Sequence, residues 1–309
     1  MNFKVYKMYF PNGIHLGKKT IEDSEFTFCA DTFFSALCQE AVKDSEERLL
    51  KLYESVQAGN LLFSDAFPYI GETYYIPKPM LKITKETDGN SKLKKAFKKL
   101  SYIPVDLLDE YLNGTMDVEQ EQKRFANQLG NAYSKVSASI RGEEKTVPYR
   151  IGVYQFSEES GLYIVIGYND IEDLEMVEEL LTGLSYAGIG GKRSSGLGRF
   201  ELYPGKMKSE FLQRLMTGGK RYMTLSVSLP QDHELEQAMQ NARYLLNKRS
   251  GFIASDTYEK EYLRKKDLYV FQAGSCFEHR FEGMVYDVSN EGKHPVYRYA
   301  KPMFLEVSV

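Results

Sequence analysis

Residues 188–202 read GIGGKRSSGLGRFEL and hold five glycines, two serines and three cations directly before a predicted strand. Glycine allows positive φ angles and lets backbone N–H groups approach a ligand closely. The cations supply positive charge and the serines supply hydroxyl donors, so the stretch predicts a loop that binds the phosphates of a polynucleotide. The candidate residues are Gly188, Gly190, Gly191, Lys192, Arg193, Ser194, Ser195, Gly196, Gly198 and Arg199.

Two other phosphate-binding loops are excluded by spacing. A P-loop needs glycine five residues before the Gly-Lys pair, where this chain has Tyr186, and Ser or Thr after the lysine, where it has Arg193. The dinucleotide fingerprint G-x-G-x-x-G also fails, because Arg193 stands at its third glycine and the loop precedes a strand instead of a helix. A glycine-rich surface turn, whose cations only keep it soluble, remains the alternative.

The elements around this loop predict a strand–helix–strand–strand–helix–strand order. Alternating apolar residues favour strands, and helices are indicated by apolar residues at helical spacing behind Asp31, an expected N-cap, and behind Asp170. A polar loop with His15 and Gly17 follows the first strand. The predicted elements are strands over 3–10, 61–67, 73–76 and 161–168, helices from Asp31 onward and over 172–183, and the strand after the glycine loop.

Residues from about 80 to 147 interrupt this order with a different composition. Residues 82–100, KITKETDGNSKLKKAFKKL, hold seven lysines against two acids, and the remainder is polar. The segment has too few apolar residues for a membrane anchor. It is interpreted as an exposed insertion, either a basic arm that reaches along RNA or a solvated helix face.

The last hundred residues predict a second small α/β unit. Strands are expected over 221–229, 268–273, 281–288 and 303–307, with a helix over 234–247. The fold class is therefore predicted as α+β, with two ferredoxin-like (RRM-like) domains. The first covers 1–204 and carries the insertion and the glycine loop, and the second covers 205–309.

The composition of the 309 residues, 42% hydrophobic with a net charge of −3, fits about two globular domains. A mildly acidic total does not exclude nucleic acid, because binding follows local basic patches. Three cysteines far apart in the chain predict neither a disulfide framework nor a metal site. With no signal peptide and no apolar run of about 18 residues, a soluble cytoplasmic protein that does not bind membranes is expected.

Catalysis and metal binding have weak support in the sequence. His15 is the one serious candidate for a general acid or base in RNA cleavage, but no second histidine with a supporting Tyr or Lys can be assigned to it. His233, His279 and His294 lack metal-ligand spacing, so neither a metal nor another cofactor is expected. A scaffold that touches only proteins would leave the glycines and cations of the loop unexplained.

Several spaced motifs resemble the RAMP superfamily of CRISPR effector subunits, over nearly the whole chain. The similarity is greatest to the subunit of the type III-A Csm complex that caps the 5′ end of the CRISPR RNA. The motifs are the HLG loop at 15–17, DTFFSAL at 31–37, the glycine-rich loop, KRSGF at 248–252, AGS at 273–275 and HPVYRY at 294–299.

The resemblance implies a non-catalytic RNA-binding subunit with two RRM-like domains. Its RNA ligand would be the 5′ repeat-derived handle of the CRISPR RNA, and its protein partners would be the large palm-domain subunit and the repeated backbone subunit. The alternative is a RAMP-type CRISPR repeat endoribonuclease that uses His15 as general acid or base.

The resemblance also assigns residues to the RNA. The glycine loop would hold the handle together with His15 and Gly17 of the preceding loop. Lys135 and Arg141 fall where the family has cations near RNA. The positions that match the C-terminal motifs, and that would bind RNA or serve the fold, are Arg249, Gly251, Gly274 and Ser275.

Overall fold

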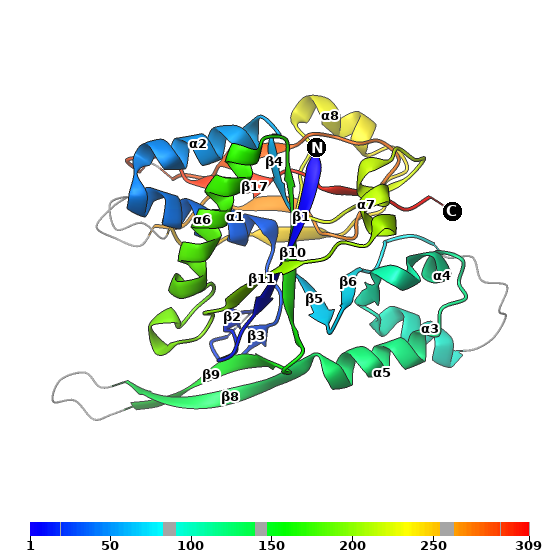
Figure 1. Ribbon diagram of the computed structural model, residues 1–309, viewed down its shortest axis with the longest axis horizontal. Coiled ribbons are helices and arrows are strands. Elements are labelled where there is room, and N and C mark those ends of the chain that lie inside the picture. The colour runs from blue at the N-terminus through cyan, green and yellow to red at the C-terminus, as the bar shows by residue number, and fades with distance from the viewer. Residues whose placement is uncertain (19, 83–90, 140–146, 254–262, 291, 309) are drawn as a thin grey trace.

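The computed structural model describes residues 1–18, 20–82, 91–139, 147–253, 263–290 and 292–308 (Figure 1). Its centre is an antiparallel sheet that joins seven described strands in the order β11-β1-β10-β5-β6-β7, with β4 also paired to β10. These strands are β1 (Asn2–Tyr9), β4 (Leu61–Phe63), β5 (Phe67–Ile70), β6 (Thr73–Pro77), β7 (Tyr102–Pro104), β10 (Ser160–Tyr168) and β11 (Glu201–Gly205).

Strands β1 and β10 lie inside this sheet, and each buries apolar side chains on both of its faces. In β10, Ile164 and Tyr163 are neighbours in sequence, point to opposite faces and are both fully buried. The register is fixed on either side of β1, with Val5 opposite Val165 of β10 and Met8 opposite Leu202 of β11. The sheet therefore supports a core on each face.

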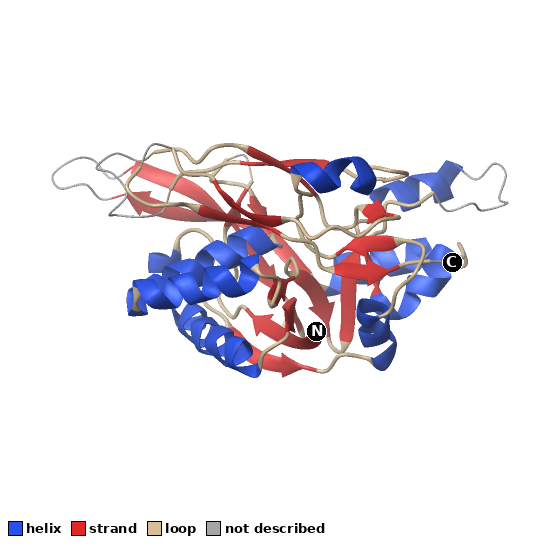
Figure 2. Ribbon diagram, turned by 90° about the horizontal axis from the view of Figure 1, so that it is seen from above, coloured by secondary structure: helices blue, strands red, loops and turns tan. Residues whose placement is uncertain are grey.

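Helices α1 (Ala30–Asp44), α2 (Glu46–Gln57) and α6 (Ile171–Ala187) pack together beside one face of the sheet (Figure 2). Helix α6 begins as the sequence predicts, because the side chain of Asp170 accepts the N–H of Glu172. It ends at Gly188, whose φ of +80° lets the chain turn into the glycine loop.

The expected capping role of Asp31 is wrong. Cys29 occupies the N-cap of α1 without a side-chain cap, and Asp31 lies inside the first turn. The first N–H of the helix, that of Ala30, is instead accepted at 2.7 Å by the carboxylate of Asp65. The carboxylate of Asp31 is drawn away from the helix end by Arg249, which lies 218 residues later in the sequence.

The insertion has two parts that differ in packing. Its helices bury Ala96, Leu100 and Leu112 in the same core as Ile76 and Tyr163 of the sheet, so the expectation of an exposed arm is wrong for this part. The hairpin of β8 and β9 extends away from the body of the molecule (Figure 1). The elements are α3 (Ser91–Lys99), η1 (Val105–Leu107), α4 (Leu108–Leu112), α5 (Val118–Gln128), β8 (Gly130–Ser139) and β9 (Val147–Phe156).

In the described residues of the C-terminal part, short antiparallel strands are accompanied by two helices. The predicted helix over 234–247 is wrong beyond Ala238, because Leu246 pairs with Phe271 in a β-ribbon. The strands are β12 (Tyr222–Thr224), β13 (Leu246–Arg249), β14 (Leu268–Phe271), β15 (Cys276–Phe277), β16 (Met284–Asp287), β17 (Tyr297–Ala300) and β18 (Phe304–Glu306); the helices are α7 (Ser209–Met216) and α8 (Asp232–Ala238). The fold is thus mixed α/β with antiparallel sheets.

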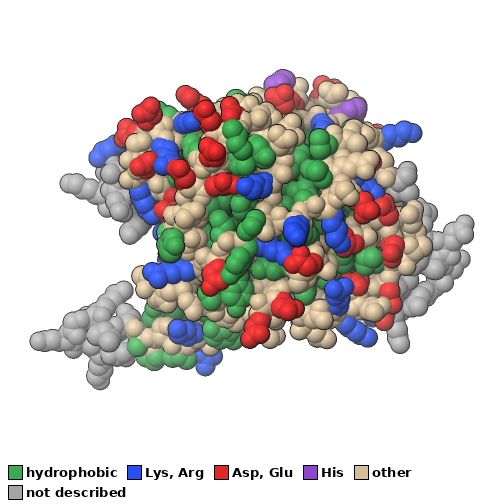
Figure 3. Space-filling model, viewed as in Figure 1, with side chains coloured by type: hydrophobic (Ala, Val, Ile, Leu, Met, Phe, Trp, Pro, Cys, Tyr) green, Lys and Arg blue, Asp and Glu red, His purple; other side chains and the backbone are tan. Residues whose placement is uncertain are grey.

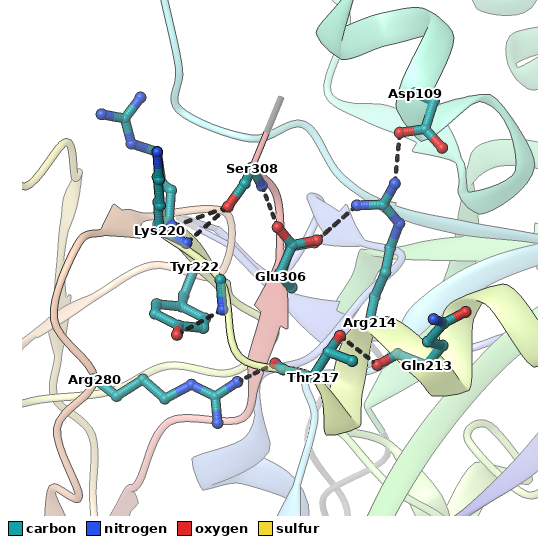
Figure 4. Close-up of polar contacts among 11 residues, drawn as sticks. Asp109, Gln213, Arg214, Thr217, Lys220, Tyr222, Arg280, Glu306 and Ser308 are labelled. Carbon is teal, nitrogen blue, oxygen red and sulfur yellow. Dashed lines mark hydrogen bonds and ion pairs between the residues drawn. The ribbon is translucent and has the colours of Figure 1, made fainter.

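An ion-pair junction ties the insertion to this C-terminal part (Figure 4). Arg214 of α7 contacts Asp109 of α4 on one side and the carboxylate of Glu306 in β18 on the other, the latter at 2.9 Å. The backbone N–H of Ser308 donates to the second carboxylate oxygen of Glu306. We call Asp109, Arg214 and Glu306 the Arg214 junction.

Candidate nucleic-acid interface

The glycine loop between α6 and β11 folds back on itself without room for side chains at its crossing point. The N–H of Ile189 donates to the carbonyl of Gly198 at 2.9 Å. A Cβ on Gly198 would lie 2.0 Å from the carbonyl oxygen of Ile189, and its φ of +77° is unfavourable for other residues. Gly198 is therefore needed for the loop's shape, and the same crossing brings Gly188 beside it.

The glycine loop also packs directly on the loop that holds His15. The N–H of Gly191 donates to the carbonyl of His15 at 2.9 Å, and a Cβ on Gly190 would lie 2.6 Å from that oxygen. The His15 ring donates from Nδ1 to the carbonyl of Gly152 at 2.6 Å and is 6% exposed. His15 thus packs against the glycine loop and supports it. Gly17 lies in the short strand β2 (Leu16–Gly17), which pairs with β3 (Ser24–Glu25).

Lys192 points towards the hairpin. It adopts a left-handed conformation, with φ of +59°, and its Nζ lies 4.8 Å from the centre of the Tyr149 ring in β9. The ammonium also donates to the Tyr149 hydroxyl at 3.3 Å. The remaining polar side chains at the tip, Arg193, Ser194, Ser195 and Arg199, are exposed.

A cleft of about 290 Å³ opens between the glycine loop, α1 and the C-terminal part. Gly188 and Gly190 contribute backbone to its wall, and Ser35 and Gln39 of α1 contribute polar side chains. One carboxylate and four cations from distant parts of the sequence also line the cleft. We call this set the cation cleft: Asp31, Arg193, Arg249, Lys265 and Arg298.

Asp31 organises the cation cleft. Arg249 donates from Nε and Nη2 to the two oxygens of Asp31 at 2.8 and 2.7 Å, a bidentate pair, and also reaches the Thr32 hydroxyl at 3.0 Å. Arg298, only 5% exposed, donates to Asp31 at 3.5 Å. One buried carboxylate therefore serves two guanidinium groups, and Lys265 and Arg193 add further positive charge.

The pKa values of the cleft's cations reflect both their burial and the excess of positive charge around Asp31. Burial lowers the pKa of Lys265, and the nearby Arg298 lowers it further. Burial also lowers the pKa of Arg298, against the opposing attraction of Asp31. Burial acts in the same direction on Arg249 and is the largest single influence, but the charge and hydrogen bond of Asp31, together with the nearby Cys29 and Asp65, outweigh it, so the pKa of Arg249 is raised. An added anion in the cleft would stabilise the charged forms of all these cations.

The other predicted RNA contacts lie in different places. Lys135 is exposed on β8, and Arg141 lies outside the described residues. Gly251 follows β13 and has φ of +138°. The AGS motif is structural in its contacts: the Gly274 N–H donates to Thr224, and Ser275 is fully buried.

Sequence reasoning missed three members of the cation cleft. Asp31 was interpreted as a helix cap, and its pairing with Arg249 could not be seen because 218 residues separate them. Arg298 lies in the HPVYRY motif, so the sequence indicates that this segment matters but does not indicate the role of Arg298 in the cleft. Lys265 stands in an ordinary polar stretch, and no signal in the sequence marks it.

The positive charge is local. On the face drawn in Figure 3, acidic and basic side chains are mixed, with acidic ones gathered over α2 and α6. A groove there is lined by Glu47, Glu54, Glu172, Glu175 and Glu179 against Arg48 and Lys51. Acidic residues therefore predominate on that surface, and it is a poor match for nucleic acid.

The described residues give no support to a metal site or a membrane span. No group of three or more His, Cys, Asp or Glu side chains within the described ranges is placed to hold a metal ion. Among the helices in the part of the chain that the structure describes, none is both long and apolar enough to cross a membrane.

Two family models match the chain in succession. The RAMP superfamily model matches residues 15–201, and the model of the CRISPR Csm4 C-terminal domain matches residues 217–307. The first match begins at His15 and ends at the start of β11, so it spans the main sheet from β4 to β10, the insertion and the glycine loop.

Curated relatives and solved structures agree with these matches. The CRISPR system Cms protein Csm4 of Mycobacterium tuberculosis is 38% identical over 305 residues, which cover 99% of this chain and 98% of the relative. The protein of the same name from Streptococcus thermophilus is 34% identical over 319 residues, covering all of both chains. A chain in the crystal structure of the Csm3-Csm4 subcomplex of the type III-A CRISPR-Cas interference complex has a similar fold, with a TM-score of 0.67 at 20% identity and coverage of 98% of each chain. A chain of the Csm1-Csm4 cassette in complex with AMPPNP gives a TM-score of 0.59 at 18% identity, covering 99% of this chain and 98% of that one.

Proposed function

This chain belongs to the Csm4 family of the RAMP superfamily, and we propose that it is the subunit of a type III-A CRISPR interference complex that holds the 5′ repeat-derived handle of the CRISPR RNA. In that complex it links the large palm-domain subunit to the repeated backbone subunits. The cation cleft is the observation that carries the RNA-binding role.

The cleft matches the chemistry of an RNA backbone. Four cations surround one carboxylate, and that carboxylate is already shared by Arg249 and Arg298. The unbalanced charge is partly buried, where an anion interacts more strongly with it than at an open surface. The backbone at Gly188 and Gly190 lets a phosphate approach without meeting a side chain. The handle's phosphates supply the missing negative charge.

The same proposal extends to the domains. The order β11-β1-β10-β4, with α1 after β1 and α6 after β10, supports a ferredoxin-like first domain over 1–204. We assign the second RRM-like domain to 205–309, and the boundary is supported by the two family models, which end at 201 and begin at 217. The remaining proposed handle contacts are the exposed residues at the tip of the glycine loop, with Lys135 of β8, and Arg141 beyond the described residues.

The partners follow from the relatives. Csm4 chains occur with Csm3 in one solved structure and with Csm1 in another, and this chain shares their fold across nearly its whole length. These complexes support docking to the backbone subunit and to the palm-domain subunit. A CRISPR effector subunit of this kind works in the cytoplasm.

The role proposed for the chain is non-catalytic. His15, on which the nuclease alternative rests, is almost completely buried and uses Nδ1 to hold the carbonyl of Gly152. Its backbone carbonyl supports the glycine loop. We therefore expect the purified protein to cut neither repeat RNA nor target RNA. Metal-independent cleavage that His15→Ala abolishes would favour the nuclease.

The RNA-binding role is tested by the salt dependence of affinity. Replacing Arg193 and Lys265 together with Ala should weaken binding of single-stranded RNA and reduce the slope of log affinity against log salt by about 1.4, if each cation neutralises one phosphate. The matched control replaces Lys51 and Lys220, which lie outside the cleft, so that the net charge changes equally. Equal slopes for the two double variants would contradict the proposed site.

A further inference from the structure

A second cavity of about 150 Å³ lies on the other side of the start of α1 from the cation cleft. Cys29 lines this cavity, while Asp31 and Thr32 line the cleft. Its walls come from the segment before α1, from the main sheet and its insertion, and from the C-terminal part, so both halves of the molecule are needed to form it. We call it the amide pocket, after the side chains of Asn247 and Gln272 in its wall.

The amide pocket combines apolar rings with free hydrogen-bonding groups. Phe67 is buried, and the Tyr102 ring stacks on Phe125 at 5.6 Å, which holds its orientation. Within the described part of the chain, the side-chain amides of Asn247 and Gln272 make no hydrogen bond. Each of these half-buried amides offers a donor and an acceptor.

The acidic group in the wall is already in use. One carboxylate oxygen of Asp65 accepts the N–H of Ala30 at 2.7 Å and the N–H of Val227 at 3.0 Å. These bonds fix Asp65 as part of the frame. The two amides are therefore the groups in this pocket that remain available to a ligand.

Strand β13 connects the amide pocket to the cation cleft. Asn247 lines the pocket and Arg249 lines the cleft. Residues two apart in a strand face the same way and lie about 7 Å from each other. One nucleotide spans about 3.4 Å in a stacked strand and more in an unstacked one, so a single strand reaches both cavities within one or two nucleotides.

We propose that the amide pocket takes one unstacked, single-ring base of the RNA whose backbone lies in the cation cleft. This inference rests on the proposed function and adds base recognition to it. Single-stranded RNA is read by proteins that turn a base out of the stack, place it against aromatic side chains and hydrogen-bond its edge. Asn247 and Gln272 supply the edge contacts, and Tyr102 and Phe67 supply the apolar wall.

The size of the pocket favours a pyrimidine. A cavity of about 150 Å³ in another protein accommodates benzene, a single six-membered ring. A purine has a second ring and would project from a pocket of this volume. The paired donor and acceptor of an amide match the alternating donors and acceptors on the edge of a base.

The experiment is an abasic scan of RNA bound to the full-length protein. A short single-stranded RNA from the repeat is prepared with each nucleotide in turn replaced by an abasic one, and affinities are measured at fixed salt. For the wild type, removal of one particular pyrimidine should weaken binding roughly 5- to 150-fold, the range expected for one stacked base. Other positions should show smaller losses.

Two variants then locate that base. Ala273→Phe fills the pocket from its wall, and the double variant Asn247→Ala with Gln272→Ala removes the amides without adding volume. In either variant, the loss of affinity caused by an abasic nucleotide at the sensitive position should fall to the loss seen at neighbouring positions. The salt dependence of binding should not change. Thermal melting shows whether each variant is folded. If Ala273→Phe is not folded, the double variant alone provides the test.

The outcomes separate this inference from the proposed function. A wild type that binds no RNA overturns both. A wild type that binds RNA, with a salt slope that depends on Arg193 and Lys265 but an abasic profile unchanged in the pocket variants, overturns only the base pocket. Unchanged profiles together with weaker capture of a protein subunit would show that a partner's side chain fills the pocket.

Discussion

The cation cleft and the Arg214 junction use the same kinds of side chain in opposite proportions. In the junction, one arginine lies between the carboxylates of Asp109 and Glu306. In the cleft, one carboxylate lies among four cations. The junction's one surplus negative charge lies at its exposed end, at Asp109, whereas the partly buried cleft is left with uncompensated positive charge.

This difference distinguishes a structural contact from a binding site. A group whose charge is satisfied internally contributes to stability and gains little from a ligand. A partly buried excess of one sign costs stability until an ion of the other sign arrives. Substitutions of the cleft's cations should therefore be read out by RNA binding, whereas substitutions in the junction, or of the carboxylate that Arg249 and Arg298 share in the cleft, should be read out by unfolding.

The largest expected effect comes from deleting residues 80–147 behind a Gly-Ser bridge. The deletion removes β7 from the main sheet, Asp109 from the junction, and the buried side chains of Ala96, Leu100 and Leu112. Because this exposes the facing core of the sheet, the variant should lose cooperative urea unfolding. A shorter deletion within the projecting hairpin is the control. If the full deletion unfolds as cooperatively as the wild type, neither the insertion nor the junction contributes to stability.

A smaller but still large effect is expected for Asp31→Ala. The substitution leaves Arg249 and the buried Arg298 without their shared carboxylate, and loss of one partner of a buried ion pair typically costs about 3–5 kcal/mol of unfolding free energy. Asp106→Ala, which breaks the exposed pair with Lys208, is the matched control and should cost less than about 1 kcal/mol. Urea titrations compare the two. Similar losses would mean that the cleft does not depend on Asp31.

Arg214→Ala is expected to cost about 1.5–3 kcal/mol of unfolding free energy, the range for hydrogen bonds to charged groups. It removes the contacts to both Asp109 and Glu306. Its RNA affinity and salt slope should match those of the wild type once the protein is folded. If Arg214→Ala instead lowers the salt slope of RNA binding as the Arg193 and Lys265 double variant does, the distinction between a structural junction and an RNA-binding cleft is wrong.

Measured per pH unit, the smallest effect concerns Asp65, whose carboxylate accepts the backbone N–H groups of Ala30 and Val227 and lies beside the Cys29 thiol. Burial raises the pKa of Asp65 to about 7 from its ordinary value of 3.8, although hydrogen bonds from Ala30 and Val227 oppose the shift. Between pH 4 and 7 the folded protein therefore holds a proton that the unfolded chain has lost, so this group's contribution to stability falls as the pH rises. The slope is at most about 1.4 kcal/mol per pH unit.

Asp65→Asn should remove that pH dependence, because the amide oxygen still accepts both N–H groups and does not titrate in this range. Urea unfolding at several pH values between 4 and 7 gives the difference between variant and wild type. That difference should grow in favour of the variant as the pH rises. A constant difference would mean that Asp65 is ionised throughout.

Much of the first domain was predictable because its signals are local. The apolar run of β10, the cap at Asp170 and the glycine that ends α6 each involve neighbours in the sequence. The insertion was misread because its buried residues, such as Leu100 and Leu112, are scattered among lysines and acids. The helix predicted up to residue 247 failed because Leu246 belongs to a strand whose partner, Phe271, is 25 residues away.

The candidate site was predictable in part. The glycine loop was found from composition, since positive φ angles and close backbone contacts require glycine there. The cation cleft was not found, because its side chains come from five separate stretches and meet only in the folded chain. Asp31 illustrates the limit: its position predicts a cap, and its partner 218 residues away changes its role.

The position of β1 has a consequence for how the chain is made. This first strand lies between β10 and β11, which begin at residues 160 and 201. At a synthesis rate of about 5–20 residues per second, β1 leaves the ribosome roughly 8–30 seconds before β10 is complete, with both edges unpaired and with apolar side chains exposed on both faces. Such a strand is prone to aggregate. We expect nascent chains arrested before residue 160 to bind chaperones and resist native folding, and chains extended past 205 to become protease-resistant.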